Sequence, residues 1–466
     1  MVIVATNRLI QERIRAVKTS GNYISSLVKN GLAVMVILLL ACSSNQKPET
    51  PTLTVGFTND MDGNIRSCGC EERDYGGIGR RATLIQAVRD TAQNFLLLET
   101  GDFLSASINY SQEKAEVTVQ SMAIMDYHGV VLGEKDFGFG LDYILKRVRE
   151  EGLPVVMSNF YDATADTLIF PPSRTVELSG GLKVGLIGVI DPKLKIPLQV
   201  PKGAVRITDP VTAIRAQLKA IGEQVDLVAV LAHMSRREAI LLARKVNRID
   251  LLVVGHQGRS ARRDQRIGNA FILQAPQNGQ YMGFAFSVLD ERKKIARLDS
   301  RVEPLHERLQ DHAAVANIFA AYDLSIEAKE KSTVLDKQRE RGAGRKKMFL
   351  GAESCRECHQ EIFDQWQTTN HAHGYDILVA QSREFDRDCT PCHTTGFGQP
   401  GGFVSLTATP DLIHIQCESC HGFGADHAKT PETGMPADPA VACLGCHTAS
   451  QSPNFIFEEK WSLIRH

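Results

Sequence analysis

No cysteine occurs between Cys70 and Cys355, although the chain has eleven, so their placement carries information. The chain also lacks an excess of charge of either sign. Its formal net charge is -1 over 466 residues, which gives no reason to expect a nucleic-acid partner. The apolar run Gly31–Leu40 is too short to cross a bilayer, but its length suits the core of a signal peptide. A chain of this length predicts two or three domains in an exported protein.

The end of that apolar run carries a processing signal. Leu39-Leu40-Ala41-Cys42 resembles a bacterial lipobox, which implies that residues 1–41 are a signal peptide and that Cys42 is diacylated. The alternative is a plain signal peptide or a buried strand. Residues 42–51 contain two prolines among polar residues and predict a short tether. We therefore expect a membrane-anchored lipoprotein on the periplasmic face of the inner or outer membrane, or at the cell surface.

Three regions of different composition follow the tether. Residues 52–303 alternate apolar strand-like runs with helical stretches, the pattern of an α/β domain with buried strands. The expected strands are Leu53–Phe57, Phe95–Leu98, Val130–Leu132, Val184–Ile190, Leu227–Leu231 and Leu251–Val254. Residues 304–348 are charged and helical and predict a linker. Residues 349–466 are rich in Cys, His and Gly and predict a mostly helical or irregular domain.

Four C-x-x-C-H motifs lie in this last region. In such a motif two thiols three positions apart each add to a haem vinyl group, and the following histidine binds the iron. The expected attachment residues are Cys355, Cys358, Cys389, Cys392, Cys417, Cys420, Cys443 and Cys446. The expected proximal ligands are His359, His393, His421 and His447. Zinc knuckles or disulfides are the alternatives, but four repeats in an exported chain favour four covalent c-type haems.

Histidines outside the motifs are candidates for the sixth ligand, and enough of them are present for bis-histidine haems, which transfer electrons. The segments "CRECHQEIFDQWQTTNHAHG" and "CESCHGFGADH" resemble the tetrahaem cytochromes c that carry electrons in hydroxylamine oxidation. That resemblance implies His371 and His427 as distal ligands, with His373 and His414 as weaker candidates. We interpret His466 as only the chain terminus.

The α/β region carries a second resemblance. "TNDMDG" (Thr58–Gly63), "LLLETGD" (Leu96–Asp102) and "GEKDFGFG" (Gly133–Gly140) are similar, in this order, to motifs of the periplasmic 5′-nucleotidase branch of the calcineurin-like metallophosphatases. "LAHMS" (Leu231–Ser235) and "VGHQG" (Val254–Gly258) continue the series. The resemblance implies a four-layer α-β-β-α sandwich with mixed sheets and the site at the strand ends.

In that family two divalent ions clamp the attacking and leaving oxygens of a phosphoryl transfer. The resemblance implies the ligands Asp60, Asp62, Asp102, Glu134, His233 and His256. Asp62 replaces a histidine, Glu134 replaces an asparagine, and Lys135 replaces the histidine that assists the leaving group, so Lys135 is the candidate catalytic residue. The added carboxylates favour Mn or Mg, with Zn or Fe also considered. In the alternative, Lys135 pairs with Glu134 or Asp102 in a site without metal.

Cys68 and Cys70 follow the Asp60–Asp62 loop directly. A bond between them would close a strained ring of the redox-active kind. Three interpretations stay open: a redox pair, soft metal ligands at the mouth of the site, or two idle thiols.

The two halves together predict a lipid-anchored tetrahaem electron carrier whose metallophosphatase-like domain binds two divalent metals and hydrolyses a phosphoester. Expected partners are other cytochromes or a quinol-linked complex, the membrane, and a small anionic or phosphoester substrate. One alternative is an electron carrier with a catalytically silent phosphatase scaffold. The other is an oxidoreductase in which Cys68 and Cys70 form the redox pair.

Overall fold

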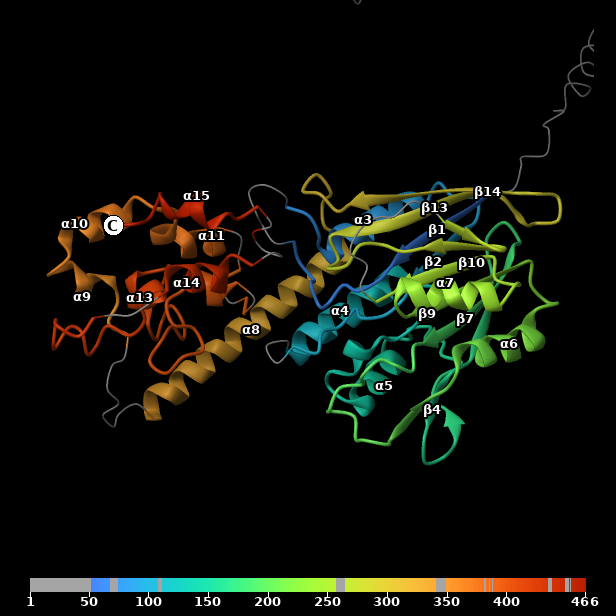
Figure 1. The fold of residues 1–466 in the computed structure, drawn as a ribbon, viewed down its shortest axis with the longest axis horizontal. Coiled ribbons are helices and arrows are strands. Elements are labelled where there is room, and N and C mark those ends of the chain that lie inside the picture. The colour runs from blue at the N-terminus through green and yellow to red at the C-terminus, as the bar shows by residue number, and fades with distance from the viewer. Residues whose placement is uncertain are drawn as a thin grey trace, which may run out of the picture. The chain divides into compact units, whose positions relative to one another are not determined.

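The computed structural model describes residues 52–67, 74–107, 111–256, 265–340, 349–380, 383–384, 386–387, 389–434, 438–448, 452 and 454–466. The strands lie in the N-terminal part and are arranged in sheets (Figure 1). The C-terminal part consists of short helices and irregular segments.

The first sheet has five strands in the order β14-β13-β1-β2-β3. Its centre is β1 (Thr52–Thr58), which pairs in parallel with β2 (Phe95–Glu99) and antiparallel with β13 (Tyr281–Leu289). The edges are β3 (Gly129–Val130) and β14 (Ile295–Pro304). Every residue of β2 is buried, as expected for a strand covered on both faces.

The second sheet has six strands in the order β11-β12-β10-β9-β7-β6. Its central members are β7 (Lys183–Ile190), β9 (Leu227–His233) and β10 (Leu251–Gly255), all parallel. Their side chains alternate between two apolar clusters, because successive residues of a strand point to opposite faces. The remaining strands are β6 (Ser173–Glu177), β11 (Gln265–Ile267) and β12 (Ala270–Leu273).

These clusters define four layers. The first cluster joins the facing sides of the two sheets, and it continues to α3 (Ile78–Arg89) and α4 (Gln112–Met125) behind the first sheet. The second cluster lies between the second sheet and the helices α6 (Pro210–Ile221) and α7 (Arg236–Lys245). The expected α-β-β-α sandwich is therefore present.

Smaller elements complete this part. A three-stranded sheet has the order β5-β4-β8, with β4 at Phe160–Asp162, β5 at Thr167–Leu168 and β8 at Val205–Ile207. Helix α5 spans Leu141–Glu150. The long helix α8 (Ala313–Glu340) packs against α3 and α4.

Each expected strand overlaps an observed one, but the prediction for Val130–Leu132 is wrong in its extent. Strand β3 ends at Val130, although Val131 and Leu132 are also fully buried. The chain leaves the sheet there because Gly133 starts the 3-10 helix η1 (Glu134–Phe137). Burial alone therefore does not keep these residues in a strand.

The C-terminal part contains α9 (Ala352–Arg356), α10 (Gln360–Gln367), η2 (Asn370–His373), α11 (Gly374–Ala380), α12 (Thr390–His393), η3 (Pro410–Leu412), α13 (Cys417–His421), α14 (Pro439–Cys446) and α15 (Phe457–Trp461). Among its described residues, the buried apolar cluster has five members: Phe349, Tyr375, Leu378, Phe403 and Leu412. Phe397 and Ile413, which are partly buried, pack against this cluster.

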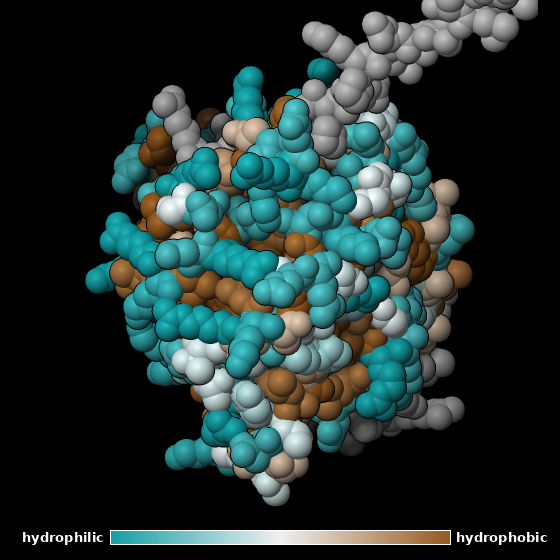
Figure 2. Space-filling model, turned by 90° about the vertical axis from the view of Figure 1, so that its right-hand side faces the viewer, coloured by the Kyte–Doolittle hydropathy of each residue, from teal (hydrophilic) through white to brown (hydrophobic). Residues whose placement is uncertain are grey.

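The surface is mainly polar. On the face shown in Figure 2, hydrophilic side chains cover much of the area, and hydrophobic residues lie between them. Within the described residues, no helix combines the length and the apolar composition that crossing a bilayer requires.

Candidate functional site

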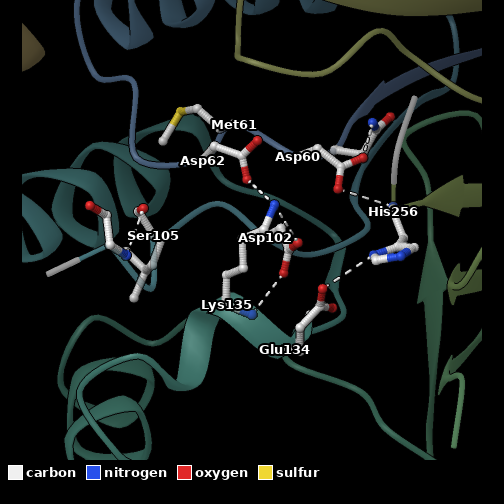
Figure 3. Close-up of polar contacts among 12 residues, drawn as sticks. Asp60, Met61, Asp62, Asp102, Ser105, Glu134, Lys135 and His256 are labelled. Atoms are coloured by element: carbon white, nitrogen blue, oxygen red, sulfur yellow. Dashed lines mark hydrogen bonds and ion pairs between the residues drawn. The ribbon is translucent and has the colours of Figure 1, made fainter. Parts of the chain in front are cut away.

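The implied metal ligands lie where strands end. Asp60 and Asp62 follow β1, and Asp102 follows β2. Glu134 and Lys135 begin η1 after β3, His233 is the last residue of β9, and His256 follows β10. Because the carboxyl ends of parallel strands meet at one edge of a sheet, these residues converge at the strand ends, where Asp60, Asp62, Asp102, Glu134, Lys135 and His256 lie together (Figure 3) and His233 joins Asp102, Glu134 and His256.

The backbone at this edge is strained. Asp60, Asp62, Asp102 and His256 have φ values of 46°, 55°, 58° and 68°, in the left-handed region that non-glycine residues rarely adopt. Two hydrogen bonds join the loops: Asp60 N donates to Gly101 O (2.9 Å) and Asp62 N donates to Asp102 O (2.9 Å). Strain of this kind persists only where the surrounding structure enforces it, and it concentrates at functional sites.

Four side chains form a compact group of ligands. Asp102, Glu134, His233 and His256 each offer one ligand atom, and these atoms all lie within 4.8 Å of one another. The ring of His233 is oriented by Thr100 O, which lies 2.7 Å from its Nδ1. Its Nε2 therefore faces Glu134 Oε2, at 2.8 Å. A histidine whose second nitrogen is held by a carbonyl is the usual arrangement of a metal ligand.

Two buried atoms in this group support the fit to a cation. Asp102 Oδ2 and His256 Nδ1 have no hydrogen-bond partner, although both are buried. Lys135 Nζ lies 3.2 Å from Asp102 Oδ2, and Glu134 Oε1 lies 3.3 Å from His256 Nδ1. Two carboxylates and two imidazoles suit Mn, Fe or Zn by ligand type. Bound there, a divalent ion would act as a Lewis acid toward an oxyanion substrate.

The other side of the pocket is different. Lys135 Nζ lies 2.5 Å from Asp62 Oδ1 and 3.2 Å from Asp102 Oδ2 (Figure 3). The main-chain N–H of Lys135 also donates to Asp102 Oδ1, at 3.0 Å. Asp60, which is almost fully buried, accepts hydrogen bonds from the Asn59 side chain (2.8 Å) and from His256 N (3.1 Å). Lys135 thus pairs with Asp62 and Asp102, not with Glu134.

The pocket is electrostatically polarised. Burial lowers the pKa of His233, but Asp102 and Glu134 outweigh burial and raise it to about 10. Burial raises the pKa of Asp62 to about 6 even though Lys135 lowers it. Burial lowers the pKa of Lys135, but Asp102 and Asp62 raise it above its usual range. The carboxylates therefore attract positive charge, either as protons or as metal ions.

Two residues that the sequence did not single out shape this pocket. Asp136 is fully buried, and its carboxylate accepts hydrogen bonds from the main-chain N–H groups of Asp102 (2.9 Å), Gly133 (2.8 Å) and Leu104 (2.8 Å). A Cβ on Gly133 would lie 2.2 Å from Asp102 Oδ1, so only glycine fits there. Both lie in the segment "GEKDFGFG", where an acidic residue beside the candidate ligand Glu134 and the candidate catalytic residue Lys135 was the available signal.

In the C-terminal part the C-x-x-C-H motifs form helical turns. His359 N donates to Cys355 O (2.9 Å), and His447 N donates to Cys443 O (2.8 Å). A helical turn places residues three apart on one face, which brings the two thiols of a motif together. All eight motif cysteines are free of disulfides. The residues present therefore fit covalent haem attachment, and a bound haem would supply one-electron chemistry.

Three motif histidines lie opposite another histidine. The ring centres are 6.1 Å apart for His359 and His427, 6.3 Å for His447 and His371, and 5.6 Å for His421 and His466. Two imidazoles sharing one metal ion at about 2 Å per bond would have ring centres about 6 Å apart. The spacing of these pairs therefore suits bis-histidine ligation. His466 was not expected here, because its distance from the motifs along the chain gave no signal.

The other two candidates, His373 and His414, face each other and not a motif histidine. The rings of His373 and His414 are 6.4 Å from each other, and His414 Nδ1 accepts a hydrogen bond from Tyr375 N. His393 Nδ1 lies 2.5 Å from Gly374 O. Among the described residues, no histidine ring contacts that of His393. Cys42, Cys68 and Cys70 lie outside the described residues.

Comparisons with known proteins find relatives of two kinds. Residues 354–422 match the family described as cytochrome c554 and c-prime. Cytochrome c-554 of Nitrosomonas europaea is 34% identical over 133 residues, which cover 24% of this chain and 56% of that protein. The C-terminal part is therefore similar to a cytochrome c, and this similarity implies haem.

The N-terminal part is similar to 5′-nucleotidases. Snake venom 5′-nucleotidase of Naja atra is 26% identical over 298 residues, which cover 56% of this chain and 55% of that protein. The calcineurin-like phosphoesterase YfkN from Bacillus subtilis shares the fold, with a TM-score of 0.52 and 21% identity over 59% of this chain and 97% of that one. The chain spans about half the length of the curated relatives that it matches.

The chain thus joins a metallophosphatase-like part to a cytochrome c-like part. The likeness to YfkN shows the fold of the first part, and the similarity to cytochrome c-554 implies haem in the second.

Proposed function

We propose that this protein is an exported electron carrier with four covalently bound c-type haems, fused to a metallophosphatase-like domain. The observation that carries the proposal is the pairing of His359, His421 and His447 with His427, His466 and His371 at the spacing of shared iron ligation. Haems held by two histidines have no open position and suit electron transfer. Redox proteins of the cell envelope are the expected partners.

The haem assignment is tested on the full chain produced with a haem-attachment system. Mass spectrometry and the pyridine haemochrome assay should give four haems per chain, and a redox titration should show reversible one-electron steps. A Cys443→Ser and Cys446→Ser double variant should lose one haem and keep the others. Fewer than four haems in the unaltered protein would contradict the proposal.

A second function is favoured by the convergence of Asp102, Glu134, His233 and His256. At this position we propose a metal-dependent phosphoester hydrolase. Asp102 and His233 would hold metal, and the half-exposed Lys135 would face the substrate oxyanion, because preorganised charge stabilises a developing anion. Asp102→Ala should abolish hydrolysis of a chromogenic phosphate ester and leave haem reduction unchanged. Equal hydrolysis by the unaltered protein and the Asp102→Ala variant would show that this site does not carry the activity.

We also propose that the protein is anchored in a membrane through diacylated Cys42, on the basis of the lipobox-like sequence. Dual acylation gives stable anchoring, whereas one chain is marginal. Cys42→Ser should move the protein from the membrane fraction to the soluble fraction, and labelled palmitate should mark only the unaltered chain. A membrane-bound Cys42→Ser variant would contradict the anchor.

A further inference from the structure

The pocket has two sides that share Asp102. On one side lie Glu134, His233 and His256, whose ligand atoms are close enough for one ion to reach all of them together with Asp102. On the other side lies Asp62, and Asp60, whose Oδ1 accepts a hydrogen bond from His256 N, lies between the two sides (Figure 3). Between Asp62 and Asp102 extends the side chain of Lys135.

The ammonium of Lys135 takes the position that a cation would need on the second side. It lies 2.5 Å from Asp62 Oδ1 and 3.2 Å from Asp102 Oδ2, which are distances of direct ion pairs. Asp102 Oδ2 is buried and makes no hydrogen bond, so the lysine is its charge partner there. A divalent ion bound to the same two oxygens would lie within about 3 Å of the ammonium and be repelled by it.

The main chain of Lys135 also contacts Asp102. Lys135 N donates to Asp102 Oδ1 at 3.0 Å, so Lys135 contacts both oxygens of Asp102. Asp136, the next residue, anchors the same turn through Asp102 N and Gly133 N. This turn therefore holds the main chain of Lys135 against Asp102, so that the ammonium reaches Asp102 Oδ2 and Asp62 Oδ1.

We propose that this pocket is a centre with one divalent ion, held by Asp102, Glu134, His233 and His256, in which the Lys135 ammonium replaces a second metal ion. The inference rests on the metal-binding part of the second proposed function. The ion and the ammonium flank the same carboxylate, so an oxyanion substrate such as a phosphate ester bridges a divalent and a monovalent charge. The site thereby keeps two cationic contacts for one anion.

The test counts Mn²⁺ on the full-length protein. Metal-free protein is equilibrated with Mn²⁺, and elemental analysis should give one Mn per chain. Lys135→Gln should raise the count to two, because the carboxylates of Asp62 and Asp102 then have no ammonium between them. Lys135→Arg keeps the charge and should stay at one. Lys193→Gln, which removes an exposed lysine paired with Glu238 at 2.8 Å, is the matched control and should also stay at one.

Electron paramagnetic resonance of the unaltered protein supplies a readout that needs no variant. One isolated Mn²⁺ gives a six-line signal, whereas two adjacent ions give an exchange-coupled spectrum. Two Mn per unaltered chain, or one Mn in Lys135→Gln, would overturn the inference while metal binding stands. No Mn in the unaltered protein would overturn the proposed metal site itself.

Discussion

The imidazole of His466 lies 5.6 Å, centre to centre, from that of His421, the histidine of the third C-x-x-C-H motif. The two residues come from separate elements: His421 ends α13, and His466 follows α15. The fold therefore brings a second imidazole to His421 from well outside the motif.

Removal of His466 should change one haem. With His466→Ala the third haem loses its sixth ligand, so about one haem per chain should shift from low spin to high spin. Electron paramagnetic resonance of the oxidised protein measures this shift. His373→Ala, which removes an exposed histidine paired with His414 and not with a motif histidine, should leave the spectrum unchanged. An unchanged spectrum for His466→Ala would show that His421 has another partner.

Asp136 should control metal affinity without binding metal. Its carboxylate accepts three main-chain N–H groups that position Asp102 and the turn of Glu134. In Asp136→Asn the amide can accept on one side only, so we expect Mn²⁺ affinity to fall about 10- to 100-fold, as for other residues that orient metal ligands. Equilibrium binding measures the change, and exposed Asp142→Asn is the control. An unchanged affinity would show that the turn holds its shape by itself.

Glu418 should stabilise the haem-binding part. This buried residue of the third motif accepts hydrogen bonds from Leu350 N (2.9 Å), Gly351 N (2.9 Å) and Gly424 N (2.8 Å). Glu418→Ala leaves these donors without their partner, so we expect a loss of about 2 to 4 kcal/mol in the free energy of unfolding. Thermal melts followed in the Soret band check this value. Glu432→Ala, at an exposed position, should melt like the unaltered protein.

Glu99 should make the N-terminal part less stable as the pH rises. Burial raises its pKa from 4.5 to about 7, although Arg81 lowers it. The neutral carboxyl is favoured in the folded state, so its contribution is fully present below pH 4.5 and is lost as the pH rises through about 7. We expect a loss of about 1 to 3 kcal/mol across that window.

Urea denaturation followed by far-ultraviolet circular dichroism measures this dependence. Glu99→Gln cannot ionise and should flatten the curve between pH 4.5 and 7, whereas Glu291→Gln, at an exposed position, should keep it. Equal slopes in all three proteins would assign the pH dependence to other groups.

The sequence predicts the central strands of the second sheet, whereas β13 was missed although it is largely buried. Strands β7, β9 and β10 are continuous apolar runs because both faces are covered, and they were expected. Strand β14 was missed because its half-exposed sequence, IARLDSRVEP, has no continuous apolar run. Strand β14 forms by antiparallel pairing with β13, and a local sequence pattern does not predict this pairing.

In the candidate sites, too, the sequence predicts local relations better than contacts between distant segments. Motif spacing places His359 and His421 beside their thiols, because that relation is local. The pairing of His421 with His466, and of Lys135 with Asp62, depends on how distant segments fold together. Likeness to a family named the six candidate ligands, but only the geometry separates Asp60 and Asp62 from the compact group of four.

The axial ligands of the haems provide the most direct test of the proposed electron carrier. Near-infrared magnetic circular dichroism of the oxidised full-length protein distinguishes bis-histidine haems from haems with other axial ligands. We expect three bis-histidine haems per chain, at His359, His421 and His447. A spectrum dominated by methionine-ligated or high-spin haem would contradict the histidine pairs, and with them the proposed electron carrier.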